Sequence, residues 1–178
     1  MIMDRITIPV EQFAARPFHL LDRQWLLLTG GSLAKGKFNA MTISWGAMGF
    51  LWNRPYLQVV VRPQRYTYEF MEQYDTFTVC AFPEAYHQAL SRLGTQSGRD
   101  GDKIARSGLT PTASTCVDAP GYTQAELIFE CRKIYSHDFD PSRFLDPSID
   151  RNYPIQDYHR TYYGEIKAIF GTPSYLAK

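Results

Sequence analysis

The sequence predicts a mainly β protein of about six or seven strands with short helices between them. Short runs rich in β-branched and aromatic residues recur along the chain, and glycine or proline residues stand between them as turn signals. A sheet of this size would expose two long edges if it stayed open. We therefore expect a closed or partly closed antiparallel barrel, with a β-sandwich as the alternative.

Six stretches have the composition of strands. The clearest is residues 56–61, a β-branched run that is too apolar for an exposed face and therefore predicts a central strand. Pro63 ends this run, because proline has no N–H to donate to a neighbouring strand. The expected strands are residues 25–29, closed by a turn at 30–32, and residues 38–45, 56–61, 76–82, 125–135 and 162–170.

Three short helices and one long loop are expected between these strands. The hydroxyl of Thr67 is expected to cap the first helix. Residues 136–159 are polar, contain three prolines and separate the last two strands, so we interpret them as a long ordered loop that forms a lid or a subunit contact. The expected helices are residues 67–73, residues 84–93 after Pro83, and residues 102–107 before Gly108.

The composition limits the classes of function. The chain has 178 residues, of which 44% are hydrophobic, so we expect one domain over residues 1–178 with a packed core. The formal net charge of +1 gives no overall field that would attract nucleic acid or an anionic membrane, so any anion site must be local. The charge-free residues 38–53 are too few to span a bilayer. Residues 1–11 lack the pattern of a secretory signal, which predicts a cytoplasmic protein.

Cysteine and histidine residues do not indicate a metal site. Cys80, Cys116 and Cys131 are widely spaced, so we expect reduced thiols, with Cys80 in the core. The four histidines lack the close spacing of a zinc site. Residues 137–143 begin like a calcium loop but carry Arg143 where glycine is needed. No metal is predicted.

Arg62 and Arg65 follow the central strand and suggest an anion site. They lie three residues apart across a turn, and Thr67 adds a hydroxyl and a backbone N–H at the start of the expected helix. One interpretation is a phosphate cradle. The other is a pair of solvated arginines beside a helix cap.

A glycine-rich segment, residues 94–103, offers a second anion-binding pattern. Its sequence GTQSGRDGDK contains glycines that let backbone N–H groups approach an anion, with Ser97 as a hydroxyl donor and Lys103 near a helix start. The segment is neither a P-loop nor a nucleophile elbow. The alternative interpretation is a flexible loop.

Residues 39–46 place small and polar side chains in a strand that should be buried. Such a strand could offer hydrogen bonds to a flat polar ring while Met41 and Trp45 supply apolar contacts. The alternative is a barrel strand with one solvated face.

These segments, together with the start of the last strand, resemble a known family. The sequences NAMTISWGAMGFLWNRP, VVVRPQRYTYEF, GTQSGRDGDK and YHRTYYGEI occur in that order. They resemble the flavin reductase-like, FMN-binding split-barrel proteins, particularly the flavoredoxin-like branch. The resemblance extends from about Trp25 to Ile166, and it is specific because four separate motifs agree in order.

The resemblance implies a six-stranded antiparallel split β-barrel of the Greek-key type, which works as a homodimer with FMN in a groove near the subunit interface. His159 matches a position near the reacting face of the flavin and is the candidate catalytic residue. The residues that match positions along the isoalloxazine and ribityl chain are Asn39, Ala40, Met41, Thr42, Ser44 and Trp45. Those that match phosphate-binding positions are Arg62, Arg65, Tyr66, Thr67, Ser97, Gly98 and Lys103.

The resemblance also implies a function. We expect a flavin reductase or related oxidoreductase that passes electrons from NAD(P)H or another small-molecule donor through FMN to a small-molecule acceptor. The alternative is a non-catalytic FMN carrier. A third class, a binder of single-stranded nucleic acid, is suggested by Tyr66, Tyr68 and Tyr162 near arginines. The near-neutral charge argues against this class, so neither nucleic acid nor membrane is an expected partner.

Overall fold

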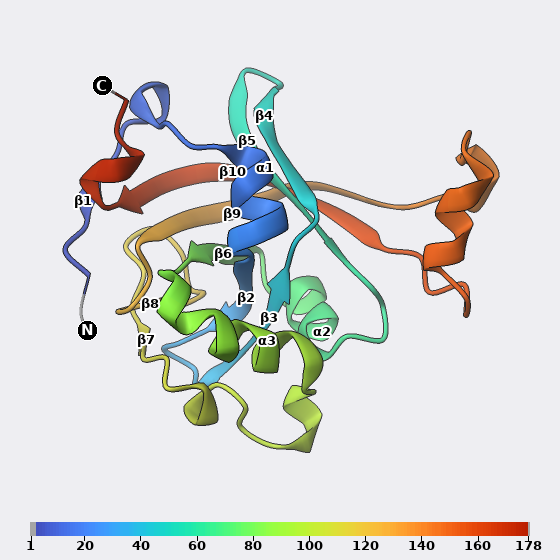
Figure 1. The fold of residues 1–178 in the computed structure, drawn as a ribbon, viewed down its shortest axis with the longest axis horizontal. Coiled ribbons are helices and arrows are strands. Elements are labelled where there is room, and N and C mark those ends of the chain that lie inside the picture. Colours follow the sequence, from blue (N-terminus) through green and yellow to red (C-terminus); the bar gives the residue numbers. More distant parts are fainter. Residues whose placement is uncertain (1–2, 178) are drawn as a thin grey trace.

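The protein is built around one curved antiparallel sheet with short helices packed against it (Figure 1). The structure is a computed structural model that describes residues 3–177. The prediction of a mainly β antiparallel fold with short flanking helices is confirmed. The strands are β1 (Ile6–Thr7), β2 (Leu26–Ser32), β3 (Lys37–Ile43), β4 (Gly46–Leu51), β5 (Arg54–Val61), β6 (Thr76–Ala81), β7 (Pro111–Thr112), β8 (Gly121–Tyr122), β9 (Leu127–Asp138) and β10 (Arg160–Gly171).

The helices are short and lie between the strands. The α-helices are α1 (Pro17–His19), α2 (Tyr66–Gln73) and α3 (His87–Thr95), and a π-helical turn covers Leu20–Gln24. The 3₁₀ turns cover Val10–Gln12, Glu84–Tyr86, Gly98–Asp100, Ala105–Ser107, Pro141–Arg143, Pro147–Asn152 and Pro173–Tyr175.

The order of the strands explains why the barrel is split. The order is β3-β2-β6-β9-β10-β5-β4, with β1 paired to β10. Strands β3 and β4 therefore stand at opposite ends of the sheet, although only residues 44–45 separate them in the chain. The sheet must curl until its two ends meet, yet these two strands do not pair with each other. The split lies at residues 44–45.

Strand β5, predicted to be central, lies inside the sheet next to the edge strand β4. It pairs with β10 on one side and β4 on the other, and Leu57, Val59 and Val61 are buried in the main core. A second core lies where α3 and residues 104–125 cover the sheet, and it includes Leu27 and Leu90. No helix within residues 3–177 is long and apolar enough to cross a membrane.

The turn expected at residues 30–32 is in a different place. Gly30 and Gly31 continue β2 instead of closing it, and β3 begins after a turn at residues 33–36. At Gly31, φ is +120° and a Cβ would lie 2.5 Å from the Cα of Phe38, so the glycine is needed for strand pairing. Strand β4 was not expected, and it raises the strand count above six.

Strands β4 and β5 are joined by a tight hairpin. Trp52 and Asn53 form its turn with φ values of +51° and +56°, which suits a tight hairpin. Pro55 lies within β5 and faces Phe50 of the edge strand.

The expected helix boundaries are also corrected. Arg65, not Thr67, is the N-cap of α2, and Thr67 lies in the first turn with its hydroxyl accepting a hydrogen bond from the amide of Asn39. The second expected helix begins as a 3₁₀ turn and continues as α3. Only the 3₁₀ turn Ala105–Ser107 forms in the third, and Gly108 ends it with φ of +77°.

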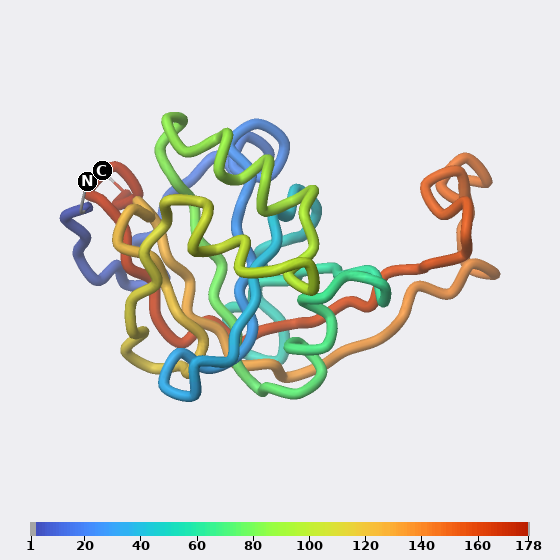
Figure 2. Tube along the Cα trace, turned by 90° about the horizontal axis from the view of Figure 1, so that it is seen from below, coloured from blue at the N-terminus to red at the C-terminus, as the bar shows by residue number. Residues whose placement is uncertain are grey.

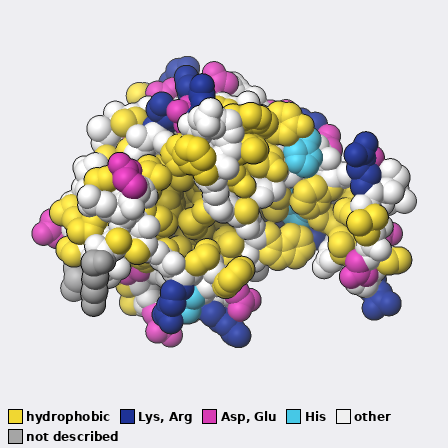
Figure 3. All heavy atoms as spheres, turned by 90° about the horizontal axis from the view of Figure 1, so that it is seen from above, with side chains coloured by type: hydrophobic (Ala, Val, Ile, Leu, Met, Phe, Trp, Pro, Cys, Tyr) yellow, Lys and Arg dark blue, Asp and Glu magenta, His cyan; other side chains and the backbone are white. Residues whose placement is uncertain are grey.

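Residues 139–159, here called the arm, project far from the sheet between β9 and β10 (Figure 2). Figure 3 shows the arm standing apart from the body of the molecule. Its tip carries hydrophobic side chains in solvent, with Leu145 99% and Ile155 72% exposed. At its base Arg62 pairs with Asp157 at 2.7 Å. This contact fastens the arm to the barrel at its base.

Cys80 lies in the core, as expected. Its side chain is fully buried, and burial raises the pKa of the thiol to about 12. The thiol is therefore protonated at neutral pH. Cys131 is also buried, whereas Cys116 is exposed.

Gly164 in β10 provides a test of the packing. A Cβ at this position would lie 2.6 Å from Cε1 of the buried Phe77 and 2.8 Å from Cβ of Cys131. We expect Gly164→Ala to lower the free energy of unfolding by about 2–3 kcal/mol, because the crowded core cannot open without strain. Gly36→Ala is the control, since its Cβ meets nothing within 4 Å and only its φ of +62° opposes the change. Its cost should be about 1 kcal/mol. Urea unfolding would measure both free energies, and an equal loss for Gly164→Ala and Gly36→Ala would contradict this account of the packing.

Candidate functional site

The predicted site residues line two neighbouring cavities that share strand β3. The first, here called the α2 cavity, measures about 100 Å³ and lies between the start of α2 and the segment that follows α3. The second, the split cavity, measures about 190 Å³ and lies beside the split in the barrel. The α2 cavity is lined by Asn39, Gln64, Arg65, Tyr66, Thr67, Thr95, Gln96, Ser97, Gly98 and Lys103. The split cavity is lined by Met41, Thr42, Ile43, Ser44, Trp45, Val60, Arg62 and His159.

Two cations at the α2 cavity are held by the carbonyl end of helix α3. Arg65 Nη2 donates to the Gly94 carbonyl at 2.6 Å. Lys103 Nζ donates to the carbonyls of Leu93 and Gln96 at 2.8 and 2.9 Å. The negative end of the helix dipole stabilises cations at this place. Both side chains are thus fixed before any ligand arrives.

Within the part of the chain that the structure describes, Arg65 and Lys103 have no carboxylate partner. Among residues 3–177, neither Arg65 nor Lys103 takes part in an ion pair with an acidic side chain. The pKa of Lys103 is lowered to about 8, mainly by burial and also by the positive charge of the nearby Arg65. Burial also lowers the pKa of Arg65, with Arg62 as a second cause. A bound anion would relieve both effects.

Uncharged donors complete the α2 cavity. The Asn39 amide donates to the Thr67 hydroxyl at 2.7 Å, which joins β3 to the first turn of α2. A Cβ at Gly98 would lie 2.8 Å from the Tyr66 ring, so only glycine lets the backbone come this close. The first N–H groups of an α-helix also favour an anion. A cavity of about 100 Å³ with these donors and two cations could hold an anion of the size of phosphate.

The split cavity is more apolar. Met41 and Val60 supply apolar walls, and the ring centroid of Trp45 lies 5.3 Å from that of His159. Trp45 is 46% exposed, so its indole is available to a flat ligand. Ser44 adds a hydroxyl at the exposed end of the strand.

His159 is buried and neutral at the base of the arm. It is 7% exposed, and its Nδ1 lies 2.8 Å from the hydroxyl of Tyr153. The pKa of His159 is lowered to about 4, mainly by burial and also by the nearby Arg62, while Asp157 opposes the shift. The imidazole therefore carries no charge near pH 7.

Two of the predicted site residues, Ala40 and Thr42, contact the α3 side of β3. Ala40 is buried in the core under α3 and lines neither cavity. Thr42 lines the split cavity, but its hydroxyl donates to the Leu90 carbonyl at 2.5 Å. Successive side chains of a strand point to opposite faces, so Ala40 and Thr42 face α3 while Asn39 and Met41 face the cavities.

The two arginines of one motif lie at different cavities. Arg65 lines the α2 cavity, whereas Arg62 lines the split cavity and is bound to the arm. Arg62 donates to Asp157 at 2.7 Å and to the Asn152 carbonyl at 2.8 Å, and its guanidinium lies 5.0 Å from the Tyr153 ring centroid. The structure does not bring the two guanidinium groups to one anion.

Sequence reasoning missed several residues of the site. Val60 and Gln64 lay inside recognised motifs, and counting alternate strand positions would have drawn attention to Val60. Tyr153 and Asp157 gave no signal, because they touch the site only through the fold of the arm. The other lining residues that were not predicted are Ile43, Thr95 and Gln96.

The protonation of His159 can be measured. An NMR titration of the imidazole should give a pKa near 4, with His159→Gln used to assign the signal. Because the unfolded chain binds its proton near pH 6.5, the stability present above that pH should be lost as the pH falls toward 4. About 1–2 kcal/mol is expected after allowance for partial solvation. Titration of His159 near pH 6.5 would show that the imidazole is not desolvated.

The chain is similar to known proteins in both sequence and fold. Residues 22–170 match the model of a family described as flavin reductase like domain. No curated protein matches the chain in sequence.

Solved structures of similar fold include an FMN-binding domain of a flavin reductases-like enzyme from Shewanella baltica, with a TM-score of 0.69 and 20% identity over 96% of this chain and 78% of that chain. Flavoredoxin from Methanosarcina acetivorans has a TM-score of 0.66 and 23% identity, and the match covers 95% of this chain and 74% of that chain. Flavoredoxin of Desulfovibrio vulgaris has a TM-score of 0.65 and 23% identity, and the match covers 84% of this chain and 70% of that chain. The family model covers most of the chain, and the protein therefore belongs to the flavin reductase-like family.

Proposed function

We propose that the protein binds FMN and works as an oxidoreductase, passing electrons from NAD(P)H or another small-molecule donor through the flavin to a small-molecule acceptor. The observation that carries this proposal is the pair of cations, Arg65 and Lys103, that border a phosphate-sized cavity without a carboxylate partner within residues 3–177. Membership of the flavin reductase-like family supports it. The solved structures of similar fold, one described as an FMN-binding domain, agree with the choice of cofactor.

The residues present fit FMN as one elongated ligand along β3. Asn39 lies at the α2 cavity and Ser44 at the split cavity. The five residue steps between them span roughly 16–17 Å of extended chain, a length comparable to that of FMN. Arg65 and Lys103 would hold the phosphate, and Trp45 would contact the ring system.

Bound FMN would supply the electron transfer, and the chain's own residues would bind, orient and shield it. Arg65 and Lys103 neutralise the phosphate dianion. Met41 and Val60 keep water from one side of the split cavity. If the Tyr153 hydroxyl donates to Nδ1 of His159, the ring proton is on Nε2, which then offers a neutral donor to a ligand in the split cavity.

A homodimer is part of the proposal. The arm exposes Leu145 and Ile155 far from the barrel, and the β4–β5 hairpin exposes Phe50 and Trp52. Apolar surface of this kind is typical of protein interfaces. A second copy of the chain could cover both regions, since a twofold dimer uses each patch twice.

The phosphate assignment can be tested with neutral substitutions. Arg65→Ala and Lys103→Ala should each weaken FMN binding about 10- to 100-fold, because each removes a charged hydrogen bond to phosphate. Riboflavin, which has no phosphate, should change by no more than about twofold. Dissociation constants from flavin fluorescence quenching would measure both effects.

Arg92→Ala on the exposed side of α3 is the matched control for these two variants. It removes an arginine from the same region without touching the α2 cavity. Equal weakening of FMN and riboflavin by Arg65→Ala or Lys103→Ala would contradict a phosphate site at these residues.

The enzymatic part of the proposal has a separate test. With FMN added, the protein should oxidise NADH or NADPH, and His159→Gln should lower kcat about tenfold or more while FMN affinity stays within about twofold. His137→Gln, on the exposed part of β9, is the control and should leave kcat unchanged. FMN binding without turnover of either nucleotide would favour the carrier function instead.

A further inference from the structure

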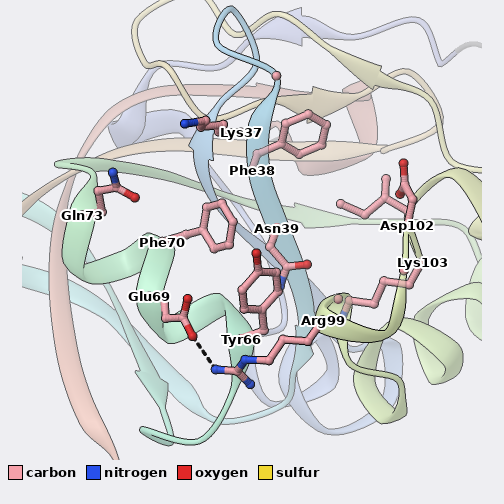
Figure 4. Close-up of a pocket in the computed structure, with 14 residues that line it drawn as sticks. Lys37, Phe38, Asn39, Tyr66, Glu69, Phe70, Gln73, Arg99, Asp102 and Lys103 are labelled. Carbon is pink, nitrogen blue, oxygen red and sulfur yellow. Dashed lines mark hydrogen bonds and ion pairs between the residues drawn. The ribbon is translucent and has the colours of Figure 1, made fainter.

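Two large cavities lie outside the α2 and split cavities. One of about 590 Å³ adjoins the α2 cavity, and Phe38, Tyr66 and Phe70 point into it (Figure 4). It shares Asn39 and Lys103 with the α2 cavity, so it belongs to the site already described. The other, here called the α3 cavity, measures about 560 Å³, within the roughly 300–1,000 Å³ of small-molecule sites. None of its lining residues lines the α2 or the split cavity.

The α3 cavity contains a carboxylate that is held in a fixed position. Oε1 of Glu126 accepts hydrogen bonds from the amide of Gln24 and the hydroxyl of Tyr175, both at 2.5 Å. The Gln24 amide also donates to the Phe82 carbonyl at 2.9 Å, which fixes the orientation of the amide. Oε2 of Glu126 accepts no hydrogen bond from residues 3–177 and is not buried, so it is free to accept one from a ligand. An acceptor that is already fixed loses little side-chain entropy on binding.

The charges around the α3 cavity favour a cation. Within the part of the chain that the structure describes, neither Glu126 nor Glu84 takes part in an ion pair. Arg23 also lines the cavity, but it pairs with Asp22 at 2.8 Å, and both side chains are exposed. The two unpaired carboxylates would therefore be stabilised by a ligand that brings positive charge.

The wall beside these carboxylates suits a flat ring. The His87 imidazole stacks on the Trp25 indole, with ring centroids 4.0 Å apart and an angle of 25° between the planes. Trp25 has φ of +60° and ψ of 158°, a conformation that is strained for any residue but glycine. This strained turn keeps the indole against His87, which makes the imidazole a firm wall. Pro83 and Leu90 add apolar surface.

We propose that the α3 cavity binds a small aromatic cation, such as an aromatic amine or amidine. The charged N–H groups of the ligand donate to Oε2 of Glu126, and Glu84 adds a second carboxylate. The ring lies against His87 and Leu90. The inference does not depend on flavin binding, because none of the residues that it uses lines the proposed FMN site.

Benzamidine is the probe for this site, and benzamide is its uncharged counterpart. In isothermal titration calorimetry the protein should bind benzamidine about tenfold or more tightly than benzamide, because only the amidinium forms charge-assisted hydrogen bonds with a carboxylate. In NMR spectra benzamidine should shift the imidazole signals of His19 and His87, which line the cavity. The signal of His137, on the exposed part of β9, should stay unchanged.

Substitutions of the two carboxylates test the assignment. Glu126→Gln should weaken benzamidine binding about tenfold and change benzamide binding by no more than about twofold, because it removes the charge but keeps an acceptor for Gln24 or Tyr175. Glu84→Gln, at an exposed position, should weaken benzamidine binding about two- to threefold. Asp118→Asn, an exposed carboxylate outside the α3 cavity, is the matched control and should change neither affinity.

The proposal can fail in three ways. Equal affinity for benzamidine and benzamide would overturn it, and so would unchanged benzamidine affinity in both Glu126→Gln and Glu84→Gln. A shift of the His159 signal alone would place the ligand in the split cavity and overturn it as well. The proposed function is decided separately by the FMN-binding measurements, so the failure of one does not imply the failure of the other.

Discussion

The structure depends on a topological constraint: the two strands at the ends of the sheet are joined by only two residues. Strands β3 and β4 must meet, so the sheet curls, but they do not pair and the barrel stays open between them. Trp45 lies in this opening, and Arg62 and His159 reach it from the ends of the neighbouring strands β5 and β10. The split cavity therefore lies where β3 and β4 form no hydrogen bonds with each other.

The positions of Arg65 and Lys103 depend on helix α3. The helix ends at residues whose carbonyl groups hold Arg65 and Lys103, and its middle packs over Ala40 on β3. A cation that is already hydrogen-bonded loses little side-chain entropy when an anion arrives. Besides covering the sheet, helix α3 holds the positive charges of Arg65 and Lys103 in a partly buried position.

Much of the fold could be predicted, because its signals are local. The apolar run of β5 and the turn residues around it required no knowledge of distant contacts. Strand β4 was missed because it is an exposed edge strand whose alternation is weak, and the loop interpretation of residues 136–159 failed to show that β9 and β10 extend into it. In the site, motif spacing indicated the residues but not the division of Arg62 and Arg65 between two cavities, which depends on the arm.

The attachment of the arm has a consequence for how the site responds to its surroundings. Asp157 and Tyr153 bind Arg62 and His159 directly, so the base of the arm is also a wall of the split cavity. Displacement of the arm would admit water to His159 and make its protonation easier. Proton binding at this histidine and any contact that holds the arm in its docked position are therefore thermodynamically linked, and each opposes the other to the same degree. Acidification would loosen whatever contact holds the arm in place.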